Sequence, residues 1–311
     1  MDNSCYERMK WIKKGLIFDP RGRFPWMVSH AMHPFAYNLE KSIYRIYFSC
    51  RDQNGYSNLA YVVLDLEQPE NIIDISESPL LAPGSLGSFD EHGVFGSCII
   101  EKGDELWMYY LGWIASDRAP LFYSSIGLAI STDRGVTFKK YSNSPIMERS
   151  PHDPFGVLIP HVIHHKNMWK MWYGSTIEWR KVVDQTISIY NIKYCSSDDG
   201  INWKREGDVA IDFINDERNV AHPHILEDIE DYKMWFSRNS GKGYSSGYAV
   251  SKDLILWQRE DTGVLSNTPD SLDSDSIQHQ HIFKHRNKYV MLYNGNDFGR
   301  DGILMAESNL G

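Results

Sequence analysis

The chain has 311 residues, of which 42% are hydrophobic, so it can bury a large core and is not typical of a disordered protein. Its net charge of -9, without a cluster of Lys and Arg, argues against nucleic acid and anionic membranes as partners, because both reward clustered positive charge. No apolar run approaches transmembrane length, and the N-terminal segment lacks the apolar core of a signal peptide, so we expect a cytoplasmic protein.

The first predicted strand is Gly15–Phe18, and a four-strand pattern follows it. A short strand at His33–Phe35 leads into an aromatic-rich strand at Tyr44–Phe48, a third at Asn58–Val63 and a fourth around Leu80–Leu81. Apolar and polar residues alternate along the aromatic-rich strand, as is typical of a half-buried strand.

Four further copies of this pattern follow in chain order, and the central residues of the five aromatic-rich strands lie 62, 63, 63 and 57 positions apart. The first strands of the later copies are Phe95–Ser97, Ile159–His161, His222–His224 and His279–His281. The aromatic-rich strands are Leu106–Tyr110, Trp169–Tyr173, Tyr232–Phe236 and Tyr289–Tyr293. The third strands are Ile126–Ile130, Ile192–Cys195, Gly247–Val250 and Ile303–Ala306, and fourth strands follow around Ile146–Met147, Val209–Ile211 and Val264–Leu265.

The fifth copy lacks a fourth strand, and Gly15–Phe18 is the segment that can supply it. Such closure hides the edge that a linear array of sheets would expose. Repeats of this kind predict an all-β fold, a five-bladed β-propeller with four antiparallel strands per blade, closed by the N-terminal strand. With no linker visible, we expect residues 1–311 to form a single domain.

Two hairpin turns support this interpretation, at Ser131–Phe138 and Ser196–Trp203. Each has the pattern S-x-D-x-G-x-x-aromatic, in which the Asp caps the turn and the Gly takes a positive φ. We expect their role to be structural. The cysteines Cys5, Cys50, Cys98 and Cys195 are scattered without a CxxC motif, which indicates reduced thiols.

The five copies, with the motifs Met171-Trp-Tyr173, Ser196–Trp203 and Tyr293–Ile303, resemble the five-bladed glycoside hydrolase propellers. These include arabinanases and xylosidases, invertases and levansucrases, and mannoside phosphorylases. The resemblance covers nearly the whole chain and implies an active site at the propeller axis, with carboxylates projecting from the inner strands. One carboxylic acid would protonate the leaving oxygen and another group would act as base or nucleophile.

The first blade of those families usually carries an Asp immediately before a Pro, and this chain has His33-Pro34 there. A neutral imidazole can act as a general base but is a poor glycosyl nucleophile, which argues against a retaining mechanism. Asp90 and Glu217 lie at equivalent positions, seven residues before Ser97 and His224, while Asp153, Asp273 and Asp275 are slightly out of register. The catalytic candidates are therefore Asp90, Glu217, His33, Asp153 and Asp275.

Substrate-binding candidates are Trp113 and His92, with Arg218, Arg238 and Arg300 as the donors that a phosphate would need in phosphorolysis. Histidines form two columns on the inner strands, one with His33, His222 and His279 and one with His161, His224 and His281. Residues two apart on a strand point the same way, so we expect two tiers of imidazoles at the axis. They bind either ordered water or a divalent metal, for which His161, His224, His281, His222 and His279 are the candidate ligands.

Three functions remain open from the sequence. The first is a carbohydrate-active enzyme, a glycoside hydrolase or phosphorylase acting on a small or oligomeric saccharide at the axial cleft. The second is a metal-dependent enzyme of another class that uses the histidine-lined axis. The third is a sugar-binding propeller without catalysis. The sequence leaves the exact substrate and the oligomeric state open.

Overall fold

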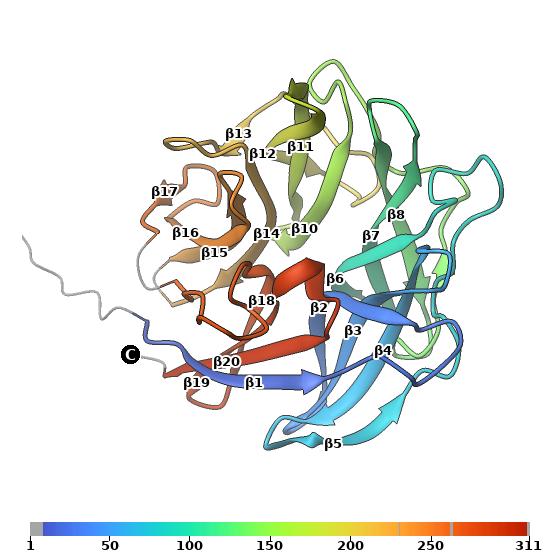
Figure 1. Cartoon of the computed structure of the whole chain (residues 1–311), viewed down its shortest axis with the longest axis vertical. Coiled ribbons are helices and arrows are strands. Elements are labelled where there is room, and N and C mark those ends of the chain that lie inside the picture. The colour runs from blue at the N-terminus through green and yellow to red at the C-terminus, as the bar shows by residue number, and fades with distance from the viewer. Residues whose placement is uncertain (1–8, 230, 262–263, 310–311) are drawn as a thin grey trace, which may run out of the picture.

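The structure is a computed structural model that describes residues 9–229, 231–261 and 264–309 (Figure 1). Within these ranges the fold is all-β, apart from the four-residue helix α1 (Asn296–Gly299). No helix there is long and apolar enough to cross a membrane.

The strands divide into antiparallel units. The first unit consists of β2 (Ser29–Glu40), β3 (Ile43–Arg51), β4 (Ser57–Asp65) and β5 (Gln68–Ile75), and the second of β6 (Val94–Lys102), β7 (Glu105–Ala115), β8 (Phe122–Ser131) and β9 (Lys139–Lys140). A larger sheet of eight strands follows. It contains β10 (Val157–His165), β11 (Met168–Val182), β12 (Gln185–Ser197) and β13 (Val209–Ile211), then β14 (Asn219–Glu227), β15 (Tyr232–Asn239), β16 (Tyr244–Ser251) and β17 (Gln258–Arg259).

The two halves of this eight-stranded sheet are joined by a single parallel residue pair, Tyr190 with Asn219. All other pairs within each half are antiparallel. The last sheet has the order β1-β20-β19-β18, with β18 (Gln278–His285), β19 (Lys288–Asn294), β20 (Ile303–Asn309) and β1 (Ile12–Phe18).

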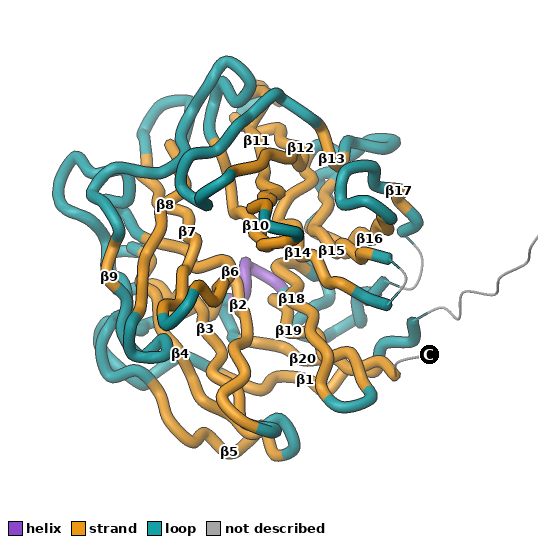
Figure 2. The backbone as a smooth tube through the Cα atoms, turned by 180° about the vertical axis from the view of Figure 1, so that it is seen from behind, coloured by secondary structure: helices purple, strands orange, loops and turns teal. Residues whose placement is uncertain are grey.

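The N-terminal strand β1 pairs antiparallel with β20, so the predicted pairing of Gly15–Phe18 with Ile303–Ala306 is confirmed. Gly15 lies opposite Met305, and Leu16 lies opposite Leu304. The first strands of the units, β2, β6, β10, β14 and β18, contact one another in that cyclic order, with β18 returning to β2. Figures 1 and 2 show these strands around the centre of the molecule, with the later strands further out.

The positions of the fourth strands were predicted less well. Val209–Ile211 forms β13 as expected, but β5, β9 and β17 lie earlier in the chain than Leu80–Leu81, Ile146–Met147 and Val264–Leu265. Leu81 and Met147 form only isolated bridges, and both side chains are buried. Their hydrophobicity indicated burial beneath a sheet, whereas the segments that pair there have mostly exposed side chains without apolar alternation.

The core lies between neighbouring sheets and is built mainly from the aromatic-rich strands. Tyr47 and Tyr109 are fully buried, and each hydroxyl donates to a carbonyl of a hairpin turn in the next unit, at Gly135 and Gly200 respectively. Both glycines have φ near +81°, and an Asp accepts backbone N–H groups in each turn, Asp133 two residues before Gly135 and Asp199 directly before Gly200. The predicted capping role is thus confirmed for Asp133, whereas in the second turn Asp199 caps in place of the motif's Asp198, which pairs with Lys204.

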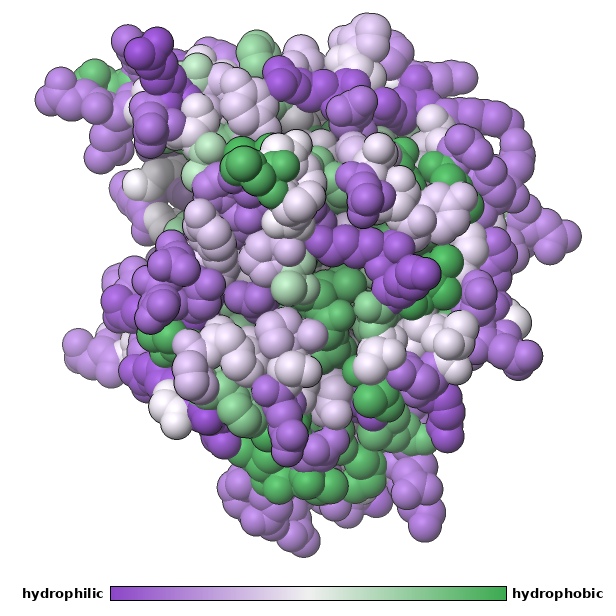
Figure 3. Space-filling model, turned by 90° about the vertical axis from the view of Figure 1, so that its right-hand side faces the viewer, coloured by the Kyte–Doolittle hydropathy of each residue, from purple (hydrophilic) through white to green (hydrophobic). Residues whose placement is uncertain are grey.

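Polar residues cover most of the face shown in Figure 3, and hydrophobic residues appear mainly in the lower part and towards the centre of that view. Cys50, Cys98 and Cys195 are buried and free, in agreement with the prediction of reduced thiols, while Cys5 lies outside the described residues.

Candidate functional site

A cavity of about 340 Å³ lies where the inner strands meet, a size typical of small-molecule sites. Its walls are largely aromatic and aliphatic. The aromatic residues of the lining are Phe95, Trp113, Phe122, Tyr190, Tyr244 and Phe298. Of the described lining residues none is Asp or Glu, and Arg51 is the one with a formal charge. We call this cavity the axial pocket.

Three histidines of the first predicted column meet in the axial pocket. The ring centroid of His33 lies 3.8 Å from that of His279 and 4.8 Å from that of His222, and the centroids of His222 and His279 are 4.9 Å apart. The predicted convergence of this column is therefore confirmed. We call these three residues the upper tier.

The backbone at the upper tier is unusual for strands. His33, His222 and His279 have φ of 53°, 57° and 57°, the left-handed region that non-glycine residues seldom adopt. Each lies at a shift in register between its inner strand and the next strand of the unit. A bulge of this kind re-aims a side chain, and the left-handed conformation costs roughly 1–3 kcal/mol per residue. Strain of this kind is enriched at functional sites, and here it recurs at three equivalent positions around the axis.

Asn294, fully buried at the end of β19, holds two members of the upper tier. Its Oδ1 accepts from the His33 backbone N–H at 3.0 Å and lies 2.9 Å from Nδ1 of His279. Its Nδ2 donates to the carbonyl oxygens of Ala31 and Gly302, so Oδ1 is the acceptor in both histidine contacts. His279 consequently carries its proton on Nδ1, and its Nε2 presents a lone pair.

Other imidazole nitrogens of the upper tier are buried without a partner among the described residues. They are Nδ1 of His33 and both ring nitrogens of His222. Burial lowers the pKa of His33 and His222 well below the ordinary value, and it lowers the pKa of His279 to about 4. The three rings are therefore neutral at pH 7 and can exchange hydrogen bonds with a ligand.

The second column forms a lower tier outside the pocket lining. The ring centroid of His224 is 4.8 Å from that of His161 and 4.5 Å from that of His281, so this column also converges. Nε2 of His224 donates to the carbonyl oxygen of Ile282 at 2.6 Å. This contact ties neighbouring inner strands together and indicates a structural role.

The predicted metal site at His161, His224, His281, His222 and His279 has no support. Among the described residues, no group of three or more His, Cys, Asp or Glu is arranged to hold a metal ion. The physical reason lies in the ring geometry. In the upper tier the rings of His33 and His279 stack with an interplanar angle of 25°, and in the lower tier His224 uses Nε2 on a carbonyl.

The predicted acids lie elsewhere than expected. Asp90 is 2% exposed and forms an ion pair of 2.6 Å with Lys140 of the outer strand β9. Ser88 and Tyr110 also donate hydrogen bonds to its carboxylate. Asp90 is not part of the pocket lining, so the expectation that it flanks a sugar opposite Glu217 is corrected. Such burial against a cation indicates a structural acid.

The same arrangement recurs in two other units. Asp153 is fully buried and accepts from Tyr173, Ser175 and Arg205, with Lys193 at 3.5 Å. Asp273 accepts from Tyr293 and pairs with Lys13 of β1. In each of the three units the Asp precedes its Tyr by 20 positions. Lys13 thus occupies in the last unit the role that Lys140 has in the second.

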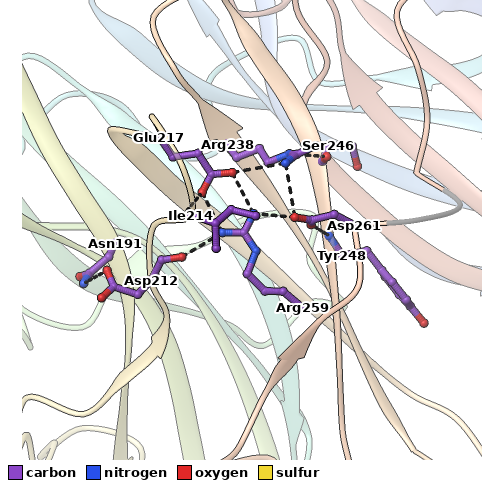
Figure 4. Close-up of polar contacts among 9 residues, drawn as sticks. All are labelled: Asn191, Asp212, Ile214, Glu217, Arg238, Ser246, Tyr248, Arg259 and Asp261. Atoms are coloured by element: carbon purple, nitrogen blue, oxygen red, sulfur yellow. Dashed lines mark hydrogen bonds and ion pairs between the residues drawn. The ribbon is translucent and has the colours of Figure 1, made fainter.

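Glu217 belongs to the unit in which this Tyr is replaced by Phe236. Its carboxylate lies 2.7 and 2.8 Å from the guanidinium of Arg259 and 3.3 Å from that of Arg238, as Figure 4 shows. Asp261 completes the cluster beside both arginines. Burial acts to raise the pKa of Glu217, but Arg259, the Ile214 N–H and Arg238 outweigh it and hold this pKa below its ordinary value. Neither Glu217 nor Arg238 lines the axial pocket.

Asp275 differs from these acids because it is exposed and its carboxylate has no hydrogen bond or ion pair among the described residues. Its backbone N–H donates to Asn296, and the hydroxyl of the next residue, Ser276, accepts from the Tyr244 N–H. Tyr244 and Phe298 line the pocket with ring centroids 6.1 Å apart. The backbone of Asp275 therefore lies beside the segments that form the pocket wall.

Of the predicted substrate-binding residues, Trp113 lines the pocket, and its indole N–H donates to Ser57 at 2.7 Å. His92 packs against Trp113 from outside the lining. Arg218 donates to the Ser240 carbonyl, and Arg300 is largely exposed and paired with Asp297, so neither reaches the lining.

Sequence reasoning missed Arg51, Asn294, Tyr190, Tyr244 and Phe298. A signal existed for Asn294. It lies three positions after Met291, where the other copies have Ser49, Leu111, Gly174 and Ser237. An amide at this one position departs from the repeat.

Residues 76–220 match the family model "Glycosyl hydrolases family 32 N-terminal domain". The chain is 36% identical over 301 residues to "Uncharacterized protein Rv1502" of Mycobacterium tuberculosis (strain ATCC 25618 / H37Rv), covering 96% of this chain and 99% of that protein. It is 26% identical over 138 residues to "Beta-1,2-mannobiose phosphorylase" of Thermoanaerobacter sp. (strain X514), covering 42% and 43% of the two chains.

A solved structure named "Glycoside hydrolase" has a similar fold, with a TM-score of 0.74 at 16% sequence identity, over 97% of this chain and 93% of that one. The chain therefore belongs to the same family as Rv1502, and it has the propeller fold of the glycoside hydrolase and phosphorylase families.

Proposed function

We propose that this protein is a carbohydrate-active enzyme that binds a saccharide in the axial pocket and acts on its glycosidic bond by hydrolysis or phosphorolysis. One observation carries the proposal: neutral histidines, with buried ring nitrogens that lack a partner among the described residues, belong to the lining of a cavity whose walls are largely aromatic and aliphatic. Aromatic faces pack against the C–H surface of a sugar ring, and the imidazoles exchange hydrogen bonds with its hydroxyl groups.

The fold that we propose for this function is a single domain, residues 1–311, with five blades of four strands closed by β1. Three observations support it. The inner strands contact one another in a closed cycle. Among the described residues, the eight-stranded sheet is held together only by the single parallel pair between β12 and β14, so it consists of two four-stranded units. Lys13 on β1 also pairs with Asp273 as Lys140 on β9 pairs with Asp90.

For the chemistry we propose Asp275 as the proton donor and His279 as the base. Cleavage of a glycoside needs an acid for the leaving oxygen and a base for water or phosphate. Asp275 is the predicted acid whose carboxylate is exposed and has no partner among the described residues, and its backbone lies beside segments that form the pocket wall. His279 is oriented by Asn294 so that Nε2 is an acceptor. Asp90, Asp153 and Glu217 are, on this proposal, structural.

The test is to incubate the protein with neutral and acidic disaccharides, with and without inorganic phosphate, and to identify products by chromatography. We expect a released monosaccharide or sugar phosphate, with turnover at least about 100-fold lower in Asp275→Asn. The matched control is Asp198→Asn, which changes an exposed acid in a hairpin and should leave turnover unchanged. Equal turnover in Asp275→Asn and the unmodified protein would refute the role of Asp275.

A second candidate function is saccharide binding without cleavage. The absence of any carboxylate from the described pocket lining favours it. It predicts that calorimetry detects saccharide binding, that Trp113→Ala weakens this binding, and that no product forms under any condition. Product formation from a bound saccharide would exclude it.

A further inference from the structure

The axial pocket holds one feature that a neutral saccharide leaves unused, the guanidinium of Arg51. Arg51 is the last residue of β3 and lies in the pocket lining, half-buried. Its guanidinium makes no hydrogen bond or ion pair with any described residue, and its Nε is buried without a partner. Nε of Arg45 and of Arg259 is likewise without a partner, but the rest of each guanidinium is engaged: Arg45 donates to the Arg134 carbonyl oxygen, and Arg259 pairs with Glu217.

The surroundings of Arg51 do nothing to balance its charge. No carboxylate is among the described lining residues. Burial is the main cause that lowers the pKa of His30 and His33, and the nearby charge of Arg51 lowers both further. Burial also lowers the pKa of Arg51 itself. A cation withdrawn from water without a counter-ion is costly to a fold, unless the missing partner arrives with a ligand.

The pocket supplies a second donor set beside this cation. His222 is 9% exposed, and neither its two ring nitrogens nor Nδ1 of His33 has a partner within the described part of the chain. One nitrogen of a neutral imidazole is always an N–H donor. A guanidinium with adjacent imidazole N–H groups matches the oxygens of a carboxylate or phosphate.

We propose that the saccharide bound in the axial pocket carries an anionic substituent, a carboxylate or a phosphate, that pairs with Arg51 beside the upper tier. This inference rests on the proposed function and names the class of its substrate. Free inorganic phosphate fits the site less well, because a cavity of about 340 Å³ with aromatic walls leaves space that a larger, partly apolar ligand must fill.

The test is calorimetry with matched ligands, glucose against glucuronate and glucose 6-phosphate, at one ionic strength. The unmodified protein should bind at least one of the two anionic sugars about tenfold or more tightly than glucose, as expected for hydrogen bonds to a charged group. Arg51→Gln should abolish this preference, and Arg51→Lys should retain part of it. Arg300→Gln removes an exposed, paired guanidinium outside the lining and should leave the preference intact.

The outcomes separate this inference from the proposed function. If neither neutral nor acidic sugars bind, the proposed function fails. If glucose binds as tightly as both acidic sugars, or if Arg51→Gln, folded by circular dichroism, keeps the preference, only the anion inference is overturned. If Arg300→Gln loses the preference for anionic sugars as fully as Arg51→Gln does, the preference comes from long-range charge, and the anion inference is overturned as well. Tight glucose binding that requires added inorganic phosphate would assign the site to a separate anion, which also contradicts the inference.

Discussion

Two regions of the molecule bury polar groups in opposite ways. Between the inner and outer strands, Asp90, Asp153, Glu217 and Asp273 each meet a Lys or Arg, and three of them also accept from a Tyr. In the axial pocket Arg51 has no counter-ion and His222 has no hydrogen-bond partner among the described residues. Buried polar groups that are fully paired stabilise a fold, whereas unpaired ones are costly. On our proposal, the unpaired groups of the axial pocket gain their partners when a ligand binds.

Acidification should have the largest effect on stability, because the axial histidines are buried and neutral. Burial lowers the pKa of His224 and His279 to about 4, against about 6.5 in an unfolded chain. Between these values the unfolded state binds protons that the folded state does not, so stability is full above about pH 6.5 and falls as the pH drops towards 4. Each such group contributes a slope of about 1.4 kcal/mol per pH unit.

Urea unfolding between pH 7 and pH 4.5 measures this slope. In His224→Gln the slope should fall by the contribution of about one proton. A free energy of unfolding that stays constant over this range would show that the imidazoles are hydrated or paired, and the contrast between the two regions would be lost.

Removing one paired acid should have the next largest effect. Asp153→Asn leaves Arg205 and Lys193 without their counter-ion in a fully buried site, so we expect a loss of about 3–5 kcal/mol in the free energy of unfolding. Chemical denaturation measures it. Asp198→Asn, at an exposed ion pair, is the control and should change nothing measurable. If Asp153→Asn is as stable as this control, the acid is not structural.

The tyrosine contacts of the same clusters should give a smaller effect. Tyr173→Phe and Tyr293→Phe each remove one hydroxyl that donates to a buried Asp, with an expected loss of about 1 kcal/mol each. Tyr141→Phe is a matched control, because half of that side chain is exposed and its hydroxyl has no partner among the described residues. Thermal unfolding should rank both buried variants below this control, and the reverse order would contradict their role in the clusters.

Most of the fold could be predicted from the sequence because its strand pattern is repeated. The aromatic-rich strands, the pairing of β1 with β20 and the convergence of the histidine columns were all predicted, because alternation and fixed spacing determine which residues share a face. The positions of the edge strands β5, β9 and β17 were predicted wrongly, because their mostly exposed side chains show no alternation of apolar and polar residues.

The site was predicted only in part, for a physical reason. Repeat-equivalent positions show that Asp90 and Asp153 are alike, but not whether a Lys or Arg from a distant part of the chain pairs with them. The ion pairs join residues about 50 positions apart, and their partners follow no common motif. Arg51 and Asn294 were missed because each occurs in a single copy, so that repetition could not point to it.

The central claim, that the axial pocket and not the acid clusters binds the ligand, is tested most directly by NMR of histidine-labelled protein during saccharide titration. Ring signals of His33, His222 and His279 should shift with saturation, and those of His161, His224 and His281 should move much less, since only the upper tier lines the cavity. Saturable binding that leaves the upper tier signals unchanged would contradict the account.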